Sequence, residues 1–188
     1  MNISNLYFER GEEKMALYTY KPHFYKKSTK EIEIFDENHK RIGSMQRYYK
    51  NKWMRVVDHF IDEYEVNLKA FYADGDSLIN VVDITPFTKI IGGEWKIERA
   101  DGENNRISDK TKIKTHIRYE LQYKEKNYLF TKDIGDRTMR LRDESNTLHA
   151  EITYDNMLPP MTITVKNHSE EIDVWTIVCV YYLYSLRT

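Results

Sequence analysis

Residues 170–188 read EEIDVWTIVCVYYLYSLRT, the most apolar stretch of an otherwise polar chain of 188 residues. Between Val174 and Leu186 the only clearly polar side chains are Thr176 and Ser185. At helical spacing these residues leave no polar stripe. A helix that is apolar on every side has to be surrounded on every side.

The start of this segment favours a helix over a strand. Several acidic residues precede the apolar part, where the positive end of a helix dipole would lie. Asn167 and Glu170 also have the spacing of a capping box. We therefore predict a helix at about residues 169–186.

The length of the apolar part decides between a membrane span and burial in the protein. As a helix it would be roughly 20 Å long at 1.5 Å per residue, whereas a bilayer core is about 30 Å thick. We therefore predict that the helix is buried within its own domain. A tail anchor made of residues 172–186 stays an alternative that membrane extraction would test.

Almost every part of the chain before residue 167 alternates apolar and polar residues with period 2. The clearest run, TKIKTHIRYELQY (111–123), describes a strand with one side on a core. Asn-, Asp- and Gly-rich turns such as ADGD (73–76) and DESN (143–146) separate the runs. The predicted strands lie at or within 16–25, 31–35, 41–48, 54–60, 64–72, 78–84, 94–99, 111–123, 128–132, 138–142, 148–154 and 161–166.

Roughly eleven or twelve short strands joined by hairpins predict an antiparallel barrel or sandwich. A helix of about 20 Å matches the height of a closed barrel of five- or six-residue strands. The fold class is therefore mainly β, a closed antiparallel β-barrel around a central hydrophobic C-terminal α-helix. No Pro/Ser-rich linker divides the chain, so we expect residues 1–188 to form a single domain.

This order of elements resembles the tubby C-terminal-like superfamily. The units IEIFDENHKRIGSM (32–45) and MRLRDESNTLHAEI (139–152), with the acidic start EEIDVWTIVCVYYLY (170–184) of the helix, carry the resemblance. The superfamily includes tubby domains, plant LURP-one-related proteins, phospholipid scramblases and small bacterial tubby-like proteins. It implies a closed β-barrel threaded by its terminal helix.

The resemblance implies less about function. Eukaryotic tubby domains bind phosphoinositides through a basic pocket, whose residues have no matched positions here. Scramblases carry a calcium-binding acidic segment and a longer helix, and neither is apparent, so scramblase activity is not expected.

No catalytic or metal-binding motif is present in the sequence. The 6 His residues are scattered, and neither a G-x-S-x-G elbow nor a phosphate-binding G-x-x-x-x-G-K-[ST] loop occurs. Cys179 is the only cysteine, which excludes a disulfide within the chain and a zinc site built on cysteines. We predict no enzyme, no cofactor and no metal, although catalytic groups that converge from distant strands would leave no motif.

One polar strand face is basic. It carries Lys110, Lys112, Lys114, His116 and Arg118, which in a single strand would form a ridge about 27 Å long. Arg140 and Arg142 on a later strand would extend it. We predict an anionic-headgroup site there, comprising Lys110, Lys112, Lys114, Arg118, Arg140 and Arg142. The alternative is a solvated face whose lysines pair with acidic neighbours.

A second basic segment is KPHFYKKSTK (21–30), in which aromatic residues lie among lysines. That combination suits a membrane interface, and the alternative is a basic loop between strands. The predicted membrane-contact residues are Lys21, Phe24, Tyr25, Lys26, Lys27 and Lys30.

The net charge and the N-terminal sequence limit the functions that can be expected. The net charge of −1 excludes a bulk basic footprint for nucleic acid. The N-terminus lacks the basic and apolar regions of a secretory signal, so we expect a cytoplasmic protein, peripheral at the membrane. Its expected role is that of a non-enzymatic binding or scaffold domain for anionic lipid or a protein partner. A lipocalin-like barrel carrying a small hydrophobic ligand is the alternative.

Overall fold

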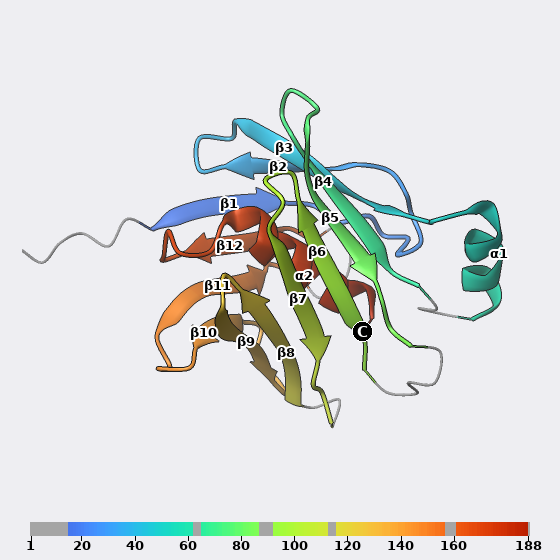
Figure 1. Cartoon of the computed structure of the whole chain (residues 1–188). Helices are drawn as coiled ribbons and strands as arrows, with labels where there is room; N and C mark the ends of the chain where they lie inside the picture. Colours follow the sequence, from blue (N-terminus) through green and yellow to red (C-terminus); the bar gives the residue numbers. More distant parts are fainter. Residues whose placement is uncertain (1–14, 62–64, 87–91, 113–115, 157–160, 188) are drawn as a thin grey trace, which may run out of the picture.

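A computed structural model describes residues 15–61, 65–86, 92–112, 116–156 and 161–187. In these residues twelve strands form a closed barrel with one helix inside it and one outside (Figure 1). The strands are β1 (Ala16–Tyr20), β2 (Ile32–Asp36), β3 (Arg41–Tyr48), β4 (Asn67–Tyr72), β5 (Ser77–Asp83), β6 (Glu94–Arg99), β7 (Asn104–Asp109), β8 (His116–Tyr123), β9 (Lys126–Asp133), β10 (Met139–Asp143), β11 (Leu148–Tyr154) and β12 (Ile163–Asn167). The helices are α1 (Lys52–Phe60) and α2 (Val174–Leu186).

The barrel is an antiparallel meander in which each strand pairs with the next along the chain. It closes where β1 pairs with β12, with Ala16 opposite Asn167 and Tyr20 opposite Ile163. The odd-numbered strands therefore all end at one end of the barrel, the end at which α1 follows β3. We call this the α1 end.

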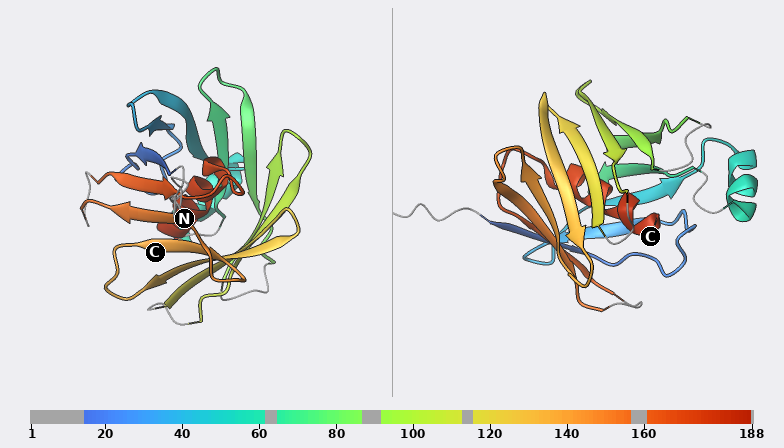
Figure 2. Two further views of the ribbon diagram at one scale, coloured as in Figure 1. Left: turned by 90° about the vertical axis from the view of Figure 1, so that its left-hand side faces the viewer. Right: turned by 90° about the horizontal axis from the view of Figure 1, so that it is seen from below.

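Helix α2 lies inside the ring of strands (Figure 2). Every residue of α2 except Ser185 is buried. A helix without a polar stripe has to be surrounded on every side, and the barrel surrounds α2 in this way. Trp175 packs edge-on against Tyr72 of β4, and Tyr184 packs against Tyr119 of β8. The predicted closed barrel around a C-terminal helix is therefore confirmed.

The predicted Asp-led turns hold the hairpins by one repeated hydrogen-bond pattern. Asp36 Oδ1 accepts from the backbone nitrogen of Lys40 at 2.9 Å, and Asp143 Oδ1 accepts from that of Thr147 at 2.8 Å. In each turn the residue just before the one that donates has a positive φ: His39 before Lys40, and Asn146 before Thr147. Side chains that bond to their own turn explain these acidic residues.

The structure overturns four local predictions. The run 54–60 is helix α1 instead of a strand. Residues 111 and 112 of the predicted strand 111–123 lie outside β8, which begins at His116, and 113–115 lie outside the described residues. Strand β7 forms at Asn104–Asp109, where no strand is predicted. Helix α2 begins at Val174, later than the predicted residue 169, and Asp173 caps it in place of the predicted Asn167–Glu170 box.

No helix in the described part of the chain is long and apolar enough to cross a membrane.

Candidate functional site

Helix α1 has a buried side, an exposed apolar side and a basic side. Asn51 caps it by accepting a hydrogen bond from the Met54 nitrogen at 2.9 Å. Asp58 is the buried residue of the helix. The large apolar side chains point outward instead, as their exposed fractions show: Trp53 77%, Val56 48% and Phe60 81%. Lys52 and Arg55, one turn apart, form a basic stripe beside them.

An ion pair attaches α1 to the barrel. Arg47, at the end of β3, donates to Asp58 Oδ1 at 2.8 Å, and both side chains are almost completely buried. The hydroxyl of Tyr49 donates to Asp58 Oδ2 at 2.7 Å. Burial, and then this hydrogen bond to a carboxylate, raise the pKa of Tyr49 well above its usual value. Arg47 also donates to the Glu65 carbonyl at 3.0 Å. The helix is thus held by polar contacts in a fixed orientation.

The basic loop 21–30 lies against the base of α1. The ammonium group of Lys27 donates to the Asp58 carbonyl at 2.5 Å, and Arg47 Nη1 donates to the Lys26 carbonyl at 3.4 Å. Phe24 and Tyr25 are 82% and 59% exposed. Lys21, Lys26 and Lys30 are exposed as well. Of the predicted membrane-contact residues, Lys26 and Lys27 therefore lie close to α1 and its anchor Arg47, whereas Lys21 lines a separate pocket that includes Glu31 and Glu33.

A pocket of about 430 Å³ lies between α1, the end of β3 and this loop. None of the described residues that line it is acidic. They are Thr29, Gln46, Arg47, Tyr48, Tyr49, Asn51, Lys52 and Arg55. Arg47 Nε is buried and has no hydrogen-bond partner among the described residues. Lys52 and Arg55 are exposed, so the pocket offers positive charge that suits an anionic group.

The surrounding segments share this charge. Between residues 21 and 30, and between 47 and 61, Asp58 is the only carboxylate, and it is buried and paired with Arg47. Lys50 pairs with Glu65 at 2.6 Å. The lysines of the loop, with Lys52 and Arg55, therefore give these two segments a net positive charge.

The predicted basic strand face is arranged differently. Lys110 lies beyond β7, and its nitrogen donates to the Arg118 carbonyl across the β7–β8 hairpin at 2.8 Å. The two residues therefore lie side by side, and the expected continuous ridge is wrong. Lys112 is exposed in the hairpin, and Lys114 lies outside the described residues.

Acidic side chains neutralise part of this face. Lys110 pairs with Glu120 at 3.3 Å. Thr131 of β9 lies between Arg118 of β8 and Arg140 of β10. Arg140 pairs with Asp136 at 2.5 Å and with Glu151 at 3.6 Å. Arg142 donates instead to the Asn146 carbonyl in the next turn. The structure thus brings Lys110, Arg118 and Arg140 together but places carboxylates among them.

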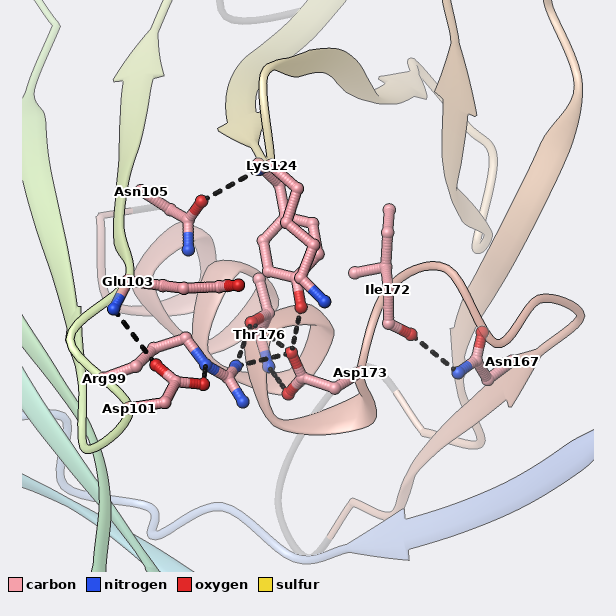
Figure 3. A network of polar contacts seen from close by, with 10 residues as sticks. Arg99, Asp101, Glu103, Asn105, Lys124, Asn167, Ile172, Asp173 and Thr176 are labelled. Carbon is pink, nitrogen blue, oxygen red and sulfur yellow. Dashed lines mark hydrogen bonds and ion pairs between the residues drawn. The ribbon is translucent and has the colours of Figure 1, made fainter.

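A polar network at the start of α2 is structural in character (Figure 3). The Asp173 carboxylate accepts from the Thr176 nitrogen at 3.0 Å, from Arg99 Nη1 at 2.6 Å and from the Tyr123 hydroxyl at 3.0 Å. Asn167 nearby donates to the Ile172 carbonyl at 3.0 Å. These contacts fix the helix inside the barrel, since they join it to β6, β8 and β12.

No group of three or more His, Cys, Asp or Glu residues in the described part of the chain could hold a metal ion.

Comparisons with known proteins agree with the fold. No curated protein sequence matches the chain. An X-ray structure of an Arabidopsis thaliana protein is similar, with a TM-score of 0.51 at 8% identity over 92% of each chain. At that identity the likeness concerns the fold alone. The family described as Tubby C-terminal like domain matches residues 18–188. The chain therefore belongs to the Tubby C-terminal like domain family.

Proposed function

We propose that this domain binds anionic phospholipid headgroups, and that the pocket between α1, β3 and loop 21–30 receives the headgroup phosphate. Family membership supports a binding or scaffold role in general. The observation that carries the lipid proposal is a pocket with Arg47, Lys52 and Arg55 in its lining and no acidic residue among its described lining residues.

The chemistry of the pocket supports a phosphate. Arginine and lysine make short, charge-assisted hydrogen bonds to phosphate oxygens. The charge of Arg47 is balanced by Asp58 and its side chain is 3% exposed, so Arg47 forms part of the pocket wall without adding net charge. Lys52 and Arg55 supply the net charge. Thr29, Tyr48 and Tyr49 add uncharged residues to the lining of the same pocket.

The strand face of Lys110, Arg118 and Arg140 is the weaker candidate for the same ligand. Glu120, Asp136 and Glu151 already pair with two of its three basic residues. An incoming phosphate would have to displace these carboxylates, and it would be repelled by them. We therefore place the headgroup in the pocket between α1, β3 and loop 21–30.

The lipocalin-like alternative requires an open apolar interior. Helix α2 occupies the barrel interior with almost fully buried side chains, including Ile177, Val180 and Leu183 at 0% exposure. A ligand of that kind would have to displace the helix. A protein partner for the basic end stays an alternative, and it predicts no response to vesicles.

Co-sedimentation with vesicles at low salt tests the proposal. Binding is expected to mixed phosphatidylserine and phosphatidylcholine vesicles, but only weakly to phosphatidylcholine alone, and it should fall as salt rises. The double variant K52Q/R55Q should bind about 30-fold more weakly, because each basic residue at an anionic surface contributes about 1 kcal/mol.

The matched control is K40Q/K124Q. Lys40 and Lys124 are exposed in hairpins at the opposite end of the barrel, and the variant changes the net charge by the same amount. It should bind nearly as the unaltered protein does. Equal binding to both vesicle types, or equal losses in the two double variants, would overturn the proposal.

A further inference from the structure

We propose that the outward apolar face of α1, together with Phe24, inserts into the interfacial region of an anionic bilayer when the headgroup is bound. This inference rests on the proposed function and adds a second, hydrophobic contact to it. The face is defined by Trp53, Val56 and Phe60, and Phe24 is an exposed residue of the loop that contacts α1.

Helix α1 exposes three of its large apolar side chains, and only Met54 and Val57 among its apolar residues are half-buried. A helix that covers a protein core turns its apolar stripe inward and its charges outward. Here Asp58 is the buried residue, whereas Trp53, Val56 and Phe60 are exposed. Their spacing of i, i+3 and i+7 places them on one side of the helix. These three side chains are not buried against the described part of the chain, so packing within the chain does not explain why they are apolar.

Exposed apolar side chains concentrate at this end of the barrel. Six of the ten large hydrophobic side chains that are exposed among the described residues belong to loop 21–30, α1 or Ile61. Two more, Ile84 and Ile134, directly follow β5 and β9, which end at the α1 end. A gathering of this kind on one side of a molecule marks an interaction surface.

The neighbouring charges identify the occupant as an anionic membrane. Lys52 and Arg55 lie beside the apolar side chains on α1, and the loop adds Lys26 and Lys30. Amphipathic helices that lie in a membrane interface combine basic residues with Trp and Phe in this way. The apolar groups enter the boundary between headgroups and acyl chains, while the basic groups stay at the phosphates.

The buried polar contacts keep this face presented. Asp58 is bonded to Arg47 and Tyr49, and its carbonyl accepts from Lys27. Helix and loop are therefore joined through one residue. Little ordering is required on binding when the inserting side chains are already oriented.

Tryptophan fluorescence provides a direct readout. Trp95 and Trp175 are 0% and 8% exposed, so a change of emission on adding vesicles reports Trp53. With mixed phosphatidylserine and phosphatidylcholine vesicles, the emission should shift to the blue. Lipids brominated on the upper acyl carbons should then quench it. Trp53→Phe should abolish both signals in protein that still sediments with the vesicles.

Truncation of the face gives a second readout. Phe60→Ser removes an exposed side chain and is expected to leave the fold intact by circular dichroism. It should lower the affinity for anionic vesicles, measured by sedimentation, about tenfold. The bound state loses the favourable free energy of burying one Phe side chain. Met15→Ser, at an exposed site at the opposite end of the barrel, is the control and should leave binding unchanged.

The outcomes separate the two proposals. Sedimentation without any Trp53 shift or quenching would overturn insertion and leave the headgroup site standing. Sedimentation of Phe60→Ser equal to that of the unaltered protein would also overturn insertion. No sedimentation with anionic vesicles would overturn the proposed function, and insertion with it. A blue shift that needs no vesicles and grows with protein concentration would assign the face to a second copy of the chain.

Discussion

Arg47 and Asp58 form an ion pair at 2.8 Å with 3% and 0% of their side chains exposed. The pair joins the end of β3 to α1 and so determines the orientation of the helix on the barrel. Removal of one partner of such a pair is costly because the other charge is left buried.

Asp58→Ala should lower the free energy of unfolding by about 3–5 kcal/mol, because Arg47 would remain as an unpaired buried charge. Urea denaturation followed by circular dichroism measures this change. The double variant Arg47→Met/Asp58→Leu should lose clearly less than Asp58→Ala, since no charge is left uncompensated. A cost of less than about 1 kcal/mol for Asp58→Ala would show that the pair does not hold the helix.

Asp173 has two roles at the start of α2, and two substitutions separate them. Asp173→Ala removes both the helix cap and the charge that faces Arg99, and should cost about 2–4 kcal/mol. Asp173→Asn retains a capping oxygen and should cost about half as much. Denaturation of both variants under the same conditions gives the comparison. Equal losses would contradict separate roles for the cap and the ion pair.

Gly43 of β3 lies close to Trp175 of α2. A Cβ atom there would overlap the Phe71 carbonyl oxygen and lie 2.6 Å from Trp175 Cη2. Gly43→Ala should therefore lower the free energy of unfolding by about 1–3 kcal/mol through overpacking. Gly75→Asn is the control, because its site is open and Asn tolerates positive φ. A neutral Gly43→Ala would mean that α2 does not pack this closely.

Buried tyrosines predict a loss of stability at alkaline pH. Burial raises the pKa of Tyr182 to about 12 and that of Tyr181 well above its ordinary value. Their neutral forms are favoured in the folded state, whereas the unfolded chain loses these protons near pH 10 (about the ordinary tyrosine value). The stabilisation is therefore complete below about pH 10 and is lost as the pH rises through the folded pKa values.

Unfolding free energies measured across this alkaline range test the expectation. They should decline with pH, and Tyr181→Phe should make the decline shallower. A free energy of unfolding that stays constant above about pH 10 would contradict the buried, neutral state of these groups.

The sequence predicted the barrel because its patterns are long and regular. Alternation along β8 and β11, and the absence of a polar stripe in α2, depend only on which side chains face the interior. Asp36 and Asp143 marked their turns for a local reason, since each bonds to its own backbone. Such signals require no knowledge of distant contacts.

Helix α1 was mistaken for a strand because its faces are inverted. Over nine residues, exposed Trp53 and Phe60 and buried Asp58 do not fit the pattern of a core-covering helix. Arg47 and Tyr49, which both precede the helix, make the burial of Asp58 favourable. Asn51 as a capping residue was the one local signal, and it was present in the sequence.

The basic strand face was overestimated for a related reason. Alternation continued from Lys110 through Arg118, but the chain reverses between β7 and β8. The carboxylates of Glu120, Asp136 and Glu151 come from segments that the alternation could not pair with these basic residues. Registers between strands, which decide such pairings, depend on the whole barrel.

Hydrogen exchange of the full chain, with and without mixed phosphatidylserine and phosphatidylcholine vesicles, tests the central claim most directly. It reports on both candidate surfaces in a single experiment. We predict slower exchange in loop 21–30 and in α1, with no change around Arg118 and Arg140. Protection confined to β8 and β10, or no protection anywhere, would contradict a membrane-binding surface formed by loop 21–30 and α1.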